Sequence, residues 1–183
     1  DDLAELVQRR ESQTWKVPGR VVDGRAEVDP DYFADLALEA DGVVTPLELD
    51  AEVRTRTEQV TLDDGVLTVR GSAHLTNVST SARSDVRLRL FSVDRAGRRI
   101  EARVEQVDEP RIDAIAKDPW NEHAQSGFVA TVDLSKLAPV TQTFEVELTV
   151  DGFTRTGPLT RPEGRGRGRV PVFDALGEDG RWC

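Results

Sequence analysis

The chain has 183 residues, of which 38% are hydrophobic and 32% charged, so it is long enough to bury the core of one domain. Its net charge of −10 disfavours attraction of the whole chain to nucleic acid or anionic lipid. No apolar run is long enough to span a membrane, and the N-terminus lacks the features of a signal peptide. The sole cysteine, Cys183, excludes an internal disulfide and a multi-cysteine zinc site.

Two features lead us to expect that this sequence is a segment of a longer protein. It contains no methionine, and its last residues, Gly180-Arg181-Trp182-Cys183, are typical of the beginning of another strand. Only three of its 24 basic residues are lysine, a bias towards arginine that is typical of GC-rich bacterial genomes.

Residues 1–42 combine several short elements and are predicted to form a mixed appendage. An i, i+3, i+4 apolar pattern predicts a helix over residues 2–10, and residues 21–25 have the form of a strand that enters a tight turn. Asp29-Pro30 supplies a cap and a first-turn proline for a second helix over residues 31–38. Because aromatic side chains are few, Trp15 and the pair Tyr32-Phe33 are expected to pack this appendage onto a sheet.

Apolar and polar residues alternate from Val43 onwards, with the period of half-buried strands. The predicted strands are 52–61, 67–75, 86–93, 99–107, 128–133, 144–150 and 153–159. Tight turns that join successive strands are predicted at residues 63–65, 94–97 and 151–152. Residues 133–137 are expected to form a single turn that crosses between two sheets.

Seven strands without a long helix between them predict a mainly β fold, an antiparallel immunoglobulin-like sandwich of Greek-key order. The predicted domain limits are 43–160 for the sandwich and 161–183 for an Arg/Gly-rich connector and the start of a further strand. The predicted core consists of Leu67, Val69, Leu75, Val86, Leu88, Leu90, Phe128, Val132, Phe144, Val146 and Leu148.

Titratable groups that could form a catalytic site are scarce, so no catalytic residue, cofactor or metal ligand is predicted. His74 lies on the polar face of its strand, which predicts plain solvent exposure. Asp63 and Asp64 could be calcium ligands, but a hairpin turn explains these residues more simply. Gly19, Gly24 and Gly42 lack the spacing of a phosphate-binding loop.

The loop of residues 118–123 brings together an aromatic ring, carboxylates, an amide and an imidazole. The Trp120 ring could stack on a sugar while neighbouring polar groups bind its hydroxyls. Trp120 could instead plug the end of the sandwich, with its neighbours solvating the loop. The candidate carbohydrate-binding residues are Trp120, Asp118, Asn121, Glu122 and His123.

Charge is distributed unevenly along the chain. Residues 23–52 contain ten acids and one arginine, whereas residues 155–169 are rich in arginine. The glycine-interleaved arginines favour a flexible connector, and the alternative is contact with a polyanion or an acidic protein surface. The candidate polyanion contacts are Arg155, Arg161, Arg165, Arg167 and Arg169.

Three short sequences together resemble a known bacterial family. They are residues 15–24 (WKVPGRVVDG), Asp31-Tyr32-Phe33 and residues 126–134 (SGFVATVDL). This pattern resembles the region that follows the catalytic domain in cell-wall glycosyltransferases of the wall-teichoic-acid type. The resemblance covers most of the chain.

The resemblance implies a non-catalytic accessory β-sandwich module that positions or oligomerises the enzyme. It implies as partners an upstream glycosyltransferase domain, a second copy of the chain, and a cell-wall glycan or polyol-phosphate polymer, but no nucleic acid and no membrane span. The implied location is the cytoplasm, at the inner face of the membrane. No catalytic residue can be transferred from the family, because its metal-binding and catalytic groups would precede residue 1. The alternative function is a carbohydrate-binding module that uses the Trp120 loop.

Overall fold

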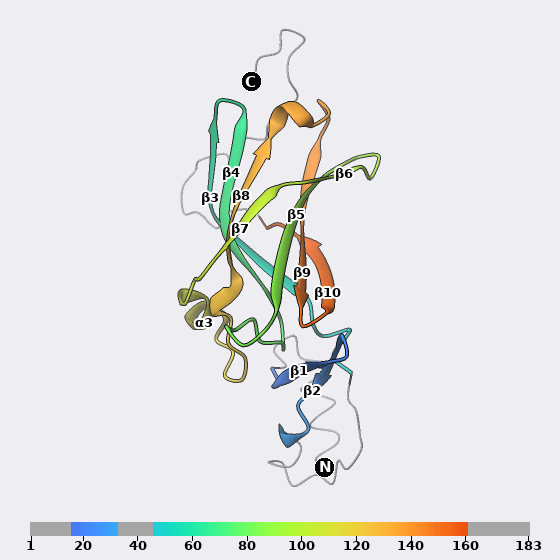
Figure 1. Cartoon of the computed structure of the whole chain (residues 1–183), viewed down its shortest axis with the longest axis vertical. Helices are drawn as coiled ribbons and strands as arrows, with labels where there is room; N and C mark the ends of the chain where they lie inside the picture. The colour runs from blue at the N-terminus through green and yellow to red at the C-terminus, as the bar shows by residue number, and fades with distance from the viewer. Residues whose placement is uncertain (1–15, 33–45, 161–183) are drawn as a thin grey trace.

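The computed structural model describes residues 16–32 and 46–160, which form two four-stranded sheets and a separate hairpin (Figure 1). The hairpin consists of β1 (Gly19–Val22) and β2 (Arg25–Val28). The remaining strands are β3 (Val53–Asp63), β4 (Val66–Leu75), β5 (Val86–Asp94), β6 (Arg99–Glu101), β7 (Arg103–Val107), β8 (Gly127–Asp133), β9 (Gln142–Val150) and β10 (Phe153–Pro158). The described helices are α3 (Arg111–Ala116) and the 3₁₀ turns η1 (Ala124–Ser126) and η2 (Leu134–Lys136).

The two sheets have the strand orders β3-β4-β8-β7 and β10-β9-β5-β6, and every pairing in them is antiparallel. Strands that are distant in sequence are therefore neighbours, as β4 and β8 are in one sheet and β5 and β9 in the other. This is the Greek-key order of immunoglobulin-like sandwiches. The predicted antiparallel immunoglobulin-like sandwich is confirmed.

Asp-Gly dipeptides set the register of three hairpins. Asp64 and Gly65 have φ angles of 45° and 77°, and the strand residues Asp63 and Val66 on either side of them pair directly. Such two-residue turns need positive φ at both positions, which Asp and Gly tolerate. The turns at residues 23–24 and 151–152 have the same geometry. The predicted turns at 63–65 and 151–152 are confirmed.

The core lies between the two sheets and is centred on fully buried side chains such as Phe128, Leu75 and Leu90. All the predicted core residues are buried except Val86 and Phe144, which are partly buried and pack against the core. The predicted crossing at residues 133–137 is also confirmed, because η2 connects β8 of one sheet to β9 of the other.

The single strand predicted over residues 99–107 is wrong. The chain changes sheets at Ala102, so that β6 pairs with β5 and β7 pairs with β8. Ala102 still donates its backbone N–H to Leu90 O at 2.8 Å, and Arg103 already pairs with Thr131. Burial alternates through Ile100, Ala102 and Val104 across the change, so the local pattern has the appearance of one strand.

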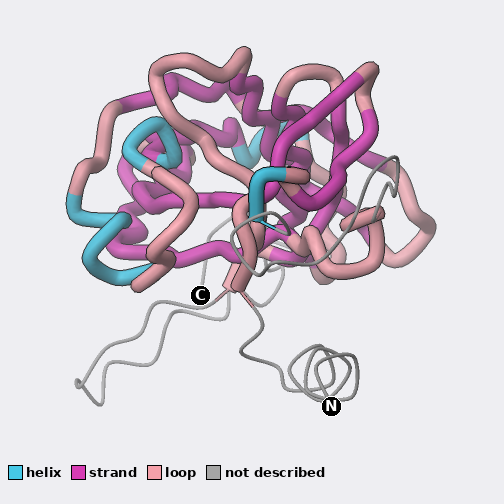
Figure 2. Tube along the Cα trace, turned by 90° about the horizontal axis from the view of Figure 1, so that it is seen from below, coloured by secondary structure: helices cyan, strands magenta, loops and turns pink. Residues whose placement is uncertain are grey.

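The N-terminal hairpin is joined to the sandwich through the core. Val17, Ala26 and Val28 are buried in the same cluster as the sandwich residues, and Leu47 donates its backbone N–H to Ala26 O at 2.9 Å. Figure 2 looks along the long axis of the molecule from the end that carries this hairpin. The strand and tight turn predicted over residues 21–25 are confirmed. The strand β2, which returns after this turn, was not predicted.

Other predictions for residues 1–42 lie partly or wholly outside the described residues. The helix over residues 2–10, Trp15 and Phe33 are outside them, and only the first two residues of the helix predicted over 31–38 are described. Tyr32 packs against the core, as expected for one of the three aromatic residues. The limits 1–42, 43–160 and 161–183 remain predictions.

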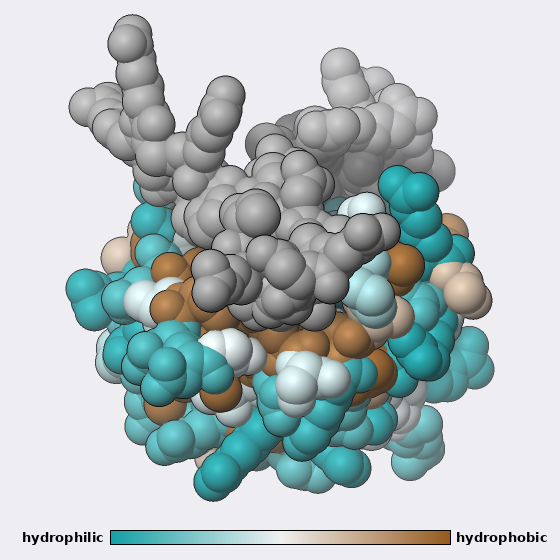
Figure 3. All heavy atoms as spheres, turned by 90° about the horizontal axis from the view of Figure 1, so that it is seen from above, coloured by the Kyte–Doolittle hydropathy of each residue, from teal (hydrophilic) through white to brown (hydrophobic). Residues whose placement is uncertain are grey.

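The opposite end of the sandwich exposes apolar side chains. Leu62 and Val66 flank the turn between β3 and β4, and Val140 lies in the connection from η2 to β9. Leu134 donates its backbone N–H to Gly65 O at 2.9 Å, which brings that turn and η2 together. Seen from this end, hydrophobic atoms lie in the middle of the surface, among polar ones (Figure 3).

Deleting residues 1–42 is expected to lower the melting temperature of the remaining chain. The deletion removes Val17, Ala26 and Val28 from the core and exposes the apolar side chains against which they pack. Thermal unfolding followed by circular dichroism measures the effect. An unchanged melting temperature would show that this region is a passive linker.

Candidate functional site

The loop of residues 118–123 lies at the end of the sandwich that holds the N-terminal hairpin, and Asn121 connects the two. The Asn121 amide is buried; its Nδ2 donates to Val17 O at 2.9 Å, and its Oδ1 accepts from Gly19 N at 3.3 Å. Oδ1 also lies 3.5 Å from Ser79 Oγ, which donates to it. A side chain predicted to bind sugar is therefore fully occupied in holding the backbone that leads into β1.

Asn77 holds the same segment from the other side. Its Oδ1 accepts the Val17 N–H at 3.1 Å, and its own backbone adopts a φ of 59°, in the left-handed region that asparagine tolerates. A Cβ on Gly19 would lie 1.7 Å from Asn77 O, so only glycine fits at this position. Both backbone groups of Val17 are thus bound by side-chain amides.

Lys16 extends this attachment to α3. Its Nζ donates to Ala116 O and, at 2.7 Å, to Lys117 O. These carbonyls lie at the C-terminal end of the helix, where Lys117 turns into the left-handed region with a φ of 49°. A cation is favourable at this position because carbonyls without a helical partner point outwards there.

Asp118 organises the loop from inside. Its carboxylate accepts from the backbone N–H of Trp120 at 3.0 Å and of Asn121 at 3.2 Å, and from Asn121 Nδ2 at 3.1 Å. Burial alone would raise the pKa of Asp118. Interaction with the His123 side chain and these hydrogen bonds outweigh the burial and lower the pKa to about 2.

The His123 ring is buried at 1% exposure, and its hydrogen bonding is incomplete. Nδ1 lies 3.4 Å from Thr80 Oγ1, whereas Nε2 is 3.8 Å from Asp118 Oδ2 and has no hydrogen-bond partner in the described part of the chain. Its backbone N–H donates to Asp113 Oδ1 on α3. His123 therefore lies inside the domain, behind the surface at which a sugar would bind.

The expectation that His74 is plainly exposed to solvent is wrong. Its ring is half-buried and lies 4.4 Å from the His123 ring, at an interplanar angle of 36°. Burial, and next the proximity of His123, lower the pKa of His74 from 6.5 to about 3. The reason for the error is non-local, because α3 and the loop 118–123 cover this part of the polar face of β4.

Trp120 and Glu122 are the members of the predicted set that face solvent. Trp120 is 49% exposed and makes an edge-to-face contact with Tyr32, at a centroid distance of 5.6 Å. The alternative in which Trp120 plugs the end of the sandwich is therefore wrong. The loop turns Asp118, Asn121 and His123 inwards and leaves Trp120 and Glu122 outside, so the five residues do not form one site.

Arg155 is the only candidate polyanion contact that the structure describes, and it makes contacts within the molecule. Its guanidinium lies over the Phe153 ring at 4.2 Å and donates to Glu48 O at 2.6 Å. Among the described acids of residues 23–52, Glu27 pairs with Arg20 at 2.6 Å and Glu48 with Arg25 at 3.3 Å. Arg161, Arg165, Arg167 and Arg169 lie outside the described residues.

Two further observations concern ligand and membrane chemistry. Across residues 16–32 and 46–160, no group of three or more His, Cys, Asp and Glu side chains is arranged to hold a metal ion. Within the same residues, no helix has the length and apolar character needed to cross a bilayer.

Asn121→Ala is expected to lower the free energy of unfolding by about 2–3 kcal/mol. The substitution leaves the buried Val17 carbonyl without its donor, and an unsatisfied buried polar group costs about 1–3 kcal/mol. Glu122→Ala is the matched control, since the neighbouring side chain is exposed. Urea unfolding of both variants measures the difference, and equal stabilities would contradict the structural role of Asn121.

The stability of the protein is expected to fall as the pH decreases from about 6.5 towards 3. The unfolded chain binds a proton at His74 near pH 6.5, whereas the folded chain does so only near its lowered pKa of about 3. One such group contributes a slope of up to about 1.4 kcal/mol per pH unit. Urea unfolding between pH 7 and pH 5 should show this slope, and it should be smaller in His74→Gln; parallel curves would contradict it.

Comparison with known proteins identifies likeness of fold only. No protein-family model and no curated protein sequence match the chain. A crystal structure of S. aureus TarS, residues 217–571, superposes with a TM-score of 0.52 and 8% identity, covering 90% of this chain and 41% of that one. A second S. aureus TarS crystal structure gives a TM-score of 0.49 with 8% identity, covering 83% of this chain and 23% of that one. The chain thus spans less than half of either structure, and the resemblance inferred from the sequence is confirmed at the level of the fold.

Proposed function

We propose that this chain is a non-catalytic accessory β-sandwich module of a bacterial cell-wall polymer glycosyltransferase. The observation that carries the proposal is the fold likeness to TarS, a wall teichoic acid glycosyltransferase, over 90% of this chain. The same family was inferred from sequence features that include residues 15–24, in which Val17 and Gly19 are bound by Asn77 and Asn121. The proposed partner is a glycosyltransferase domain on the N-terminal side, and the proposed location is the cytoplasm, at the inner face of the membrane.

The attachment of residues 16–19 supports a positioning role. Lys16 is fixed to the end of α3, and Val17 and Gly19 are fixed by the Asn77 and Asn121 amides. A domain that precedes Lys16 would therefore be connected to a rigid point on the sandwich. The module would set the direction in which that domain lies.

Self-association is the second part of the proposed role, and light scattering tests it. The whole 183-residue chain is expected to form an oligomer whose mass rises with concentration to a fixed multiple of 20.2 kDa. Size-exclusion chromatography with multi-angle light scattering measures this mass. A monomer at every concentration up to the millimolar range would remove oligomerisation from the proposal and leave positioning alone.

Carbohydrate binding is the second candidate function, and the exposure of Trp120 favours it. Nearly half of this large aromatic residue faces solvent, Tyr32 packs against it in a T-shaped contact, and the exposed Glu122 lies two residues along the loop. A sugar would stack its C–H face on the indole, while Glu122 accepts hydrogen bonds from its hydroxyls. The site is reduced to these two members of the five residues predicted from the sequence.

Trp120→Ala is expected to abolish binding of sugars in calorimetric titration, whereas Trp120→Phe should retain a weaker affinity because a ring remains. Glucose and N-acetylglucosamine are the first probes, followed by a glycan array. Folding is monitored by thermal unfolding, which the change should affect little because the side chain is half exposed. Equal sugar binding by the wild type and Trp120→Ala would exclude this loop as the site.

A further inference from the structure

After β10 the chain runs beside the edge strand β3 and in the same direction. Thr55 Oγ1 donates to Pro158 O at 2.8 Å, and Thr160 Oγ1 donates to Thr55 O at 2.6 Å. Thr57, further along β3, donates its Oγ1 hydrogen to Thr160 O at 2.5 Å. The contacts on β3 thus advance from Thr55 to Thr57 as the chain advances from Pro158 to Thr160. At Thr160 the chain is therefore directed towards the far end of β3, at Asp63.

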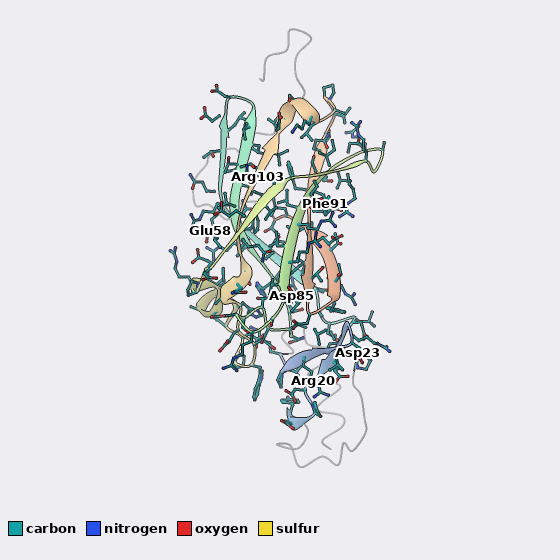
Figure 4. All side chains as sticks on the ribbon, viewed as in Figure 1. Arg20, Asp23, Glu58, Asp85, Phe91 and Arg103 are labelled. Carbon is teal, nitrogen blue, oxygen red and sulfur yellow. The ribbon has the colours of Figure 1, made fainter. Side chains whose placement is uncertain are left out.

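The outer edge of β3 is open over residues 59–63. β3 is the first strand of the sheet β3-β4-β8-β7, and no other strand of the described chain pairs with its outer edge. Glu58, which Figure 4 labels, lies just before this open stretch. An edge strand presents a row of unpaired backbone N–H and C=O groups, which proteins usually cover or blunt. A covering segment is therefore expected here.

The open edge ends at a surface that is both apolar and acidic. Leu62, Val66 and Val140 are 38%, 39% and 47% exposed, although all three are large hydrophobic residues. Asp63 and Asp64 lie between Leu62 and Val66 in the sequence and are also exposed. We refer to these five residues as the acidic–apolar end. Exposed apolar side chains that lie together indicate a contact surface.

The sequence that follows Thr160 has the complementary chemistry. Residues 165–169, the arginine tract, contain three arginines separated by glycines. Residues 170–173, the apolar run, follow directly and read Val-Pro-Val-Phe. The order of charge and apolar character thus matches a surface on which carboxylates lie beside hydrophobic side chains.

The length of the intervening chain allows this contact. From Thr57 to Leu62, five residues along β3 span about 17 Å. Residues 161–169 separate Thr160 from the apolar run, and an extended chain of that length spans up to about 30 Å. The apolar run can therefore reach the acidic–apolar end without a change in the sandwich.

We propose that residues 165–173 bind the acidic–apolar end of their own sandwich. The apolar run packs against Leu62, Val66 and Val140, which removes these side chains from water. The arginine tract pairs with the two carboxylates, and the chain before it covers the outer edge of β3. Of the two contacts considered for these arginines, a polyanion and an acidic protein surface, this arrangement favours the second.

Attachment to the same chain makes a weak contact sufficient. A short linker holds a segment at a local concentration on the order of millimolar, so three apolar side chains and two carboxylates can retain it. This contact does not rest on the accessory role proposed above.

Limited digestion of the whole chain with trypsin tests the proposal, because trypsin cleaves after arginine and the tract contains Arg165, Arg167 and Arg169. Val66→Ser is expected to speed cleavage in the tract at least threefold, since it weakens the apolar contact. Val22→Ser is the matched control, because Val22 is 40% exposed but lies on β1, at the opposite end of the molecule (Figure 1). It should leave the cleavage rate unchanged. Mass spectrometry identifies the cleaved bonds.

Asp64→Asn tests the charged part of the contact. It should speed cleavage about twofold at low salt and reduce the acceleration that high salt produces in the wild type, since salt screens ion pairs. Asp23→Asn is its matched control, because Asp23 is also the first residue of an Asp-Gly turn, with a φ of 50° against 45° for Asp64, and lies at the opposite end of the molecule (Figure 4). It should change neither the rate nor its salt dependence. An unrelated arginine peptide in the same reaction corrects for the effect of salt on trypsin.

Phe173→Ser changes the other side of the contact and should raise the rate as Val66→Ser does. The double variant should be cleaved no faster than either single variant, because both changes remove the same interaction. Thermal unfolding of each variant separates release of the segment from loss of the fold. Equal rates in the wild type, Val66→Ser and Val22→Ser, or additive effects in the double variant, would overturn the proposal. So would a wild-type rate that falls as protein concentration rises, since that result assigns the segment to a second copy.

Discussion

The arrangement at the N-terminal end depends on two buried side-chain amides that hydrogen-bond the backbone of Val17. Val17 lies in the apolar core before β1 begins, so no neighbouring strand can satisfy its N–H and C=O groups. Asn77 accepts from the N–H and Asn121 donates to the C=O, which removes the cost of burying them. The N-terminal hairpin is thereby part of the same folded unit as the sandwich.

This constraint also determines what the loop 118–123 can bind. Asn121 cannot bind a ligand without releasing Val17, and Asp118 is engaged in holding Asn121 and the loop backbone. His123 is buried behind them. Any binding by this loop therefore depends on Trp120 and Glu122, whose side chains face solvent. The loop contains the residue types of a binding site, but most of its polar side chains make hydrogen bonds within the domain.

Local sequence pattern predicts the features whose causes are local. Alternating burial and Asp-Gly turns identify most strands, because the period of two and positive φ are properties of neighbouring residues. The switch at Ala102 was missed because the alternation continues across it. Helix α3 has six residues, with only Ile112 buried, which is too little for a helical period to be recognised. The environment of His74, which lines a cavity between β3, β4 and α3, could not be predicted, because the lining residues lie more than a hundred positions apart in the sequence.

The two outer faces of the sandwich differ in how they use arginine. On the sheet β10-β9-β5-β6, Arg89 lies between Glu101 and Glu147, at 2.8 Å and 2.9 Å, and both Arg89 and Arg99 cover the Phe91 ring. These two cations are neutralised and packed within the molecule, whereas Arg87 of the same strand β5 is exposed. Arg56 of the other sheet lies beside a cavity and has no such acidic partner in the described part of the chain. The local arrangement of acids, and not the net charge of the chain, therefore determines which arginines are neutralised.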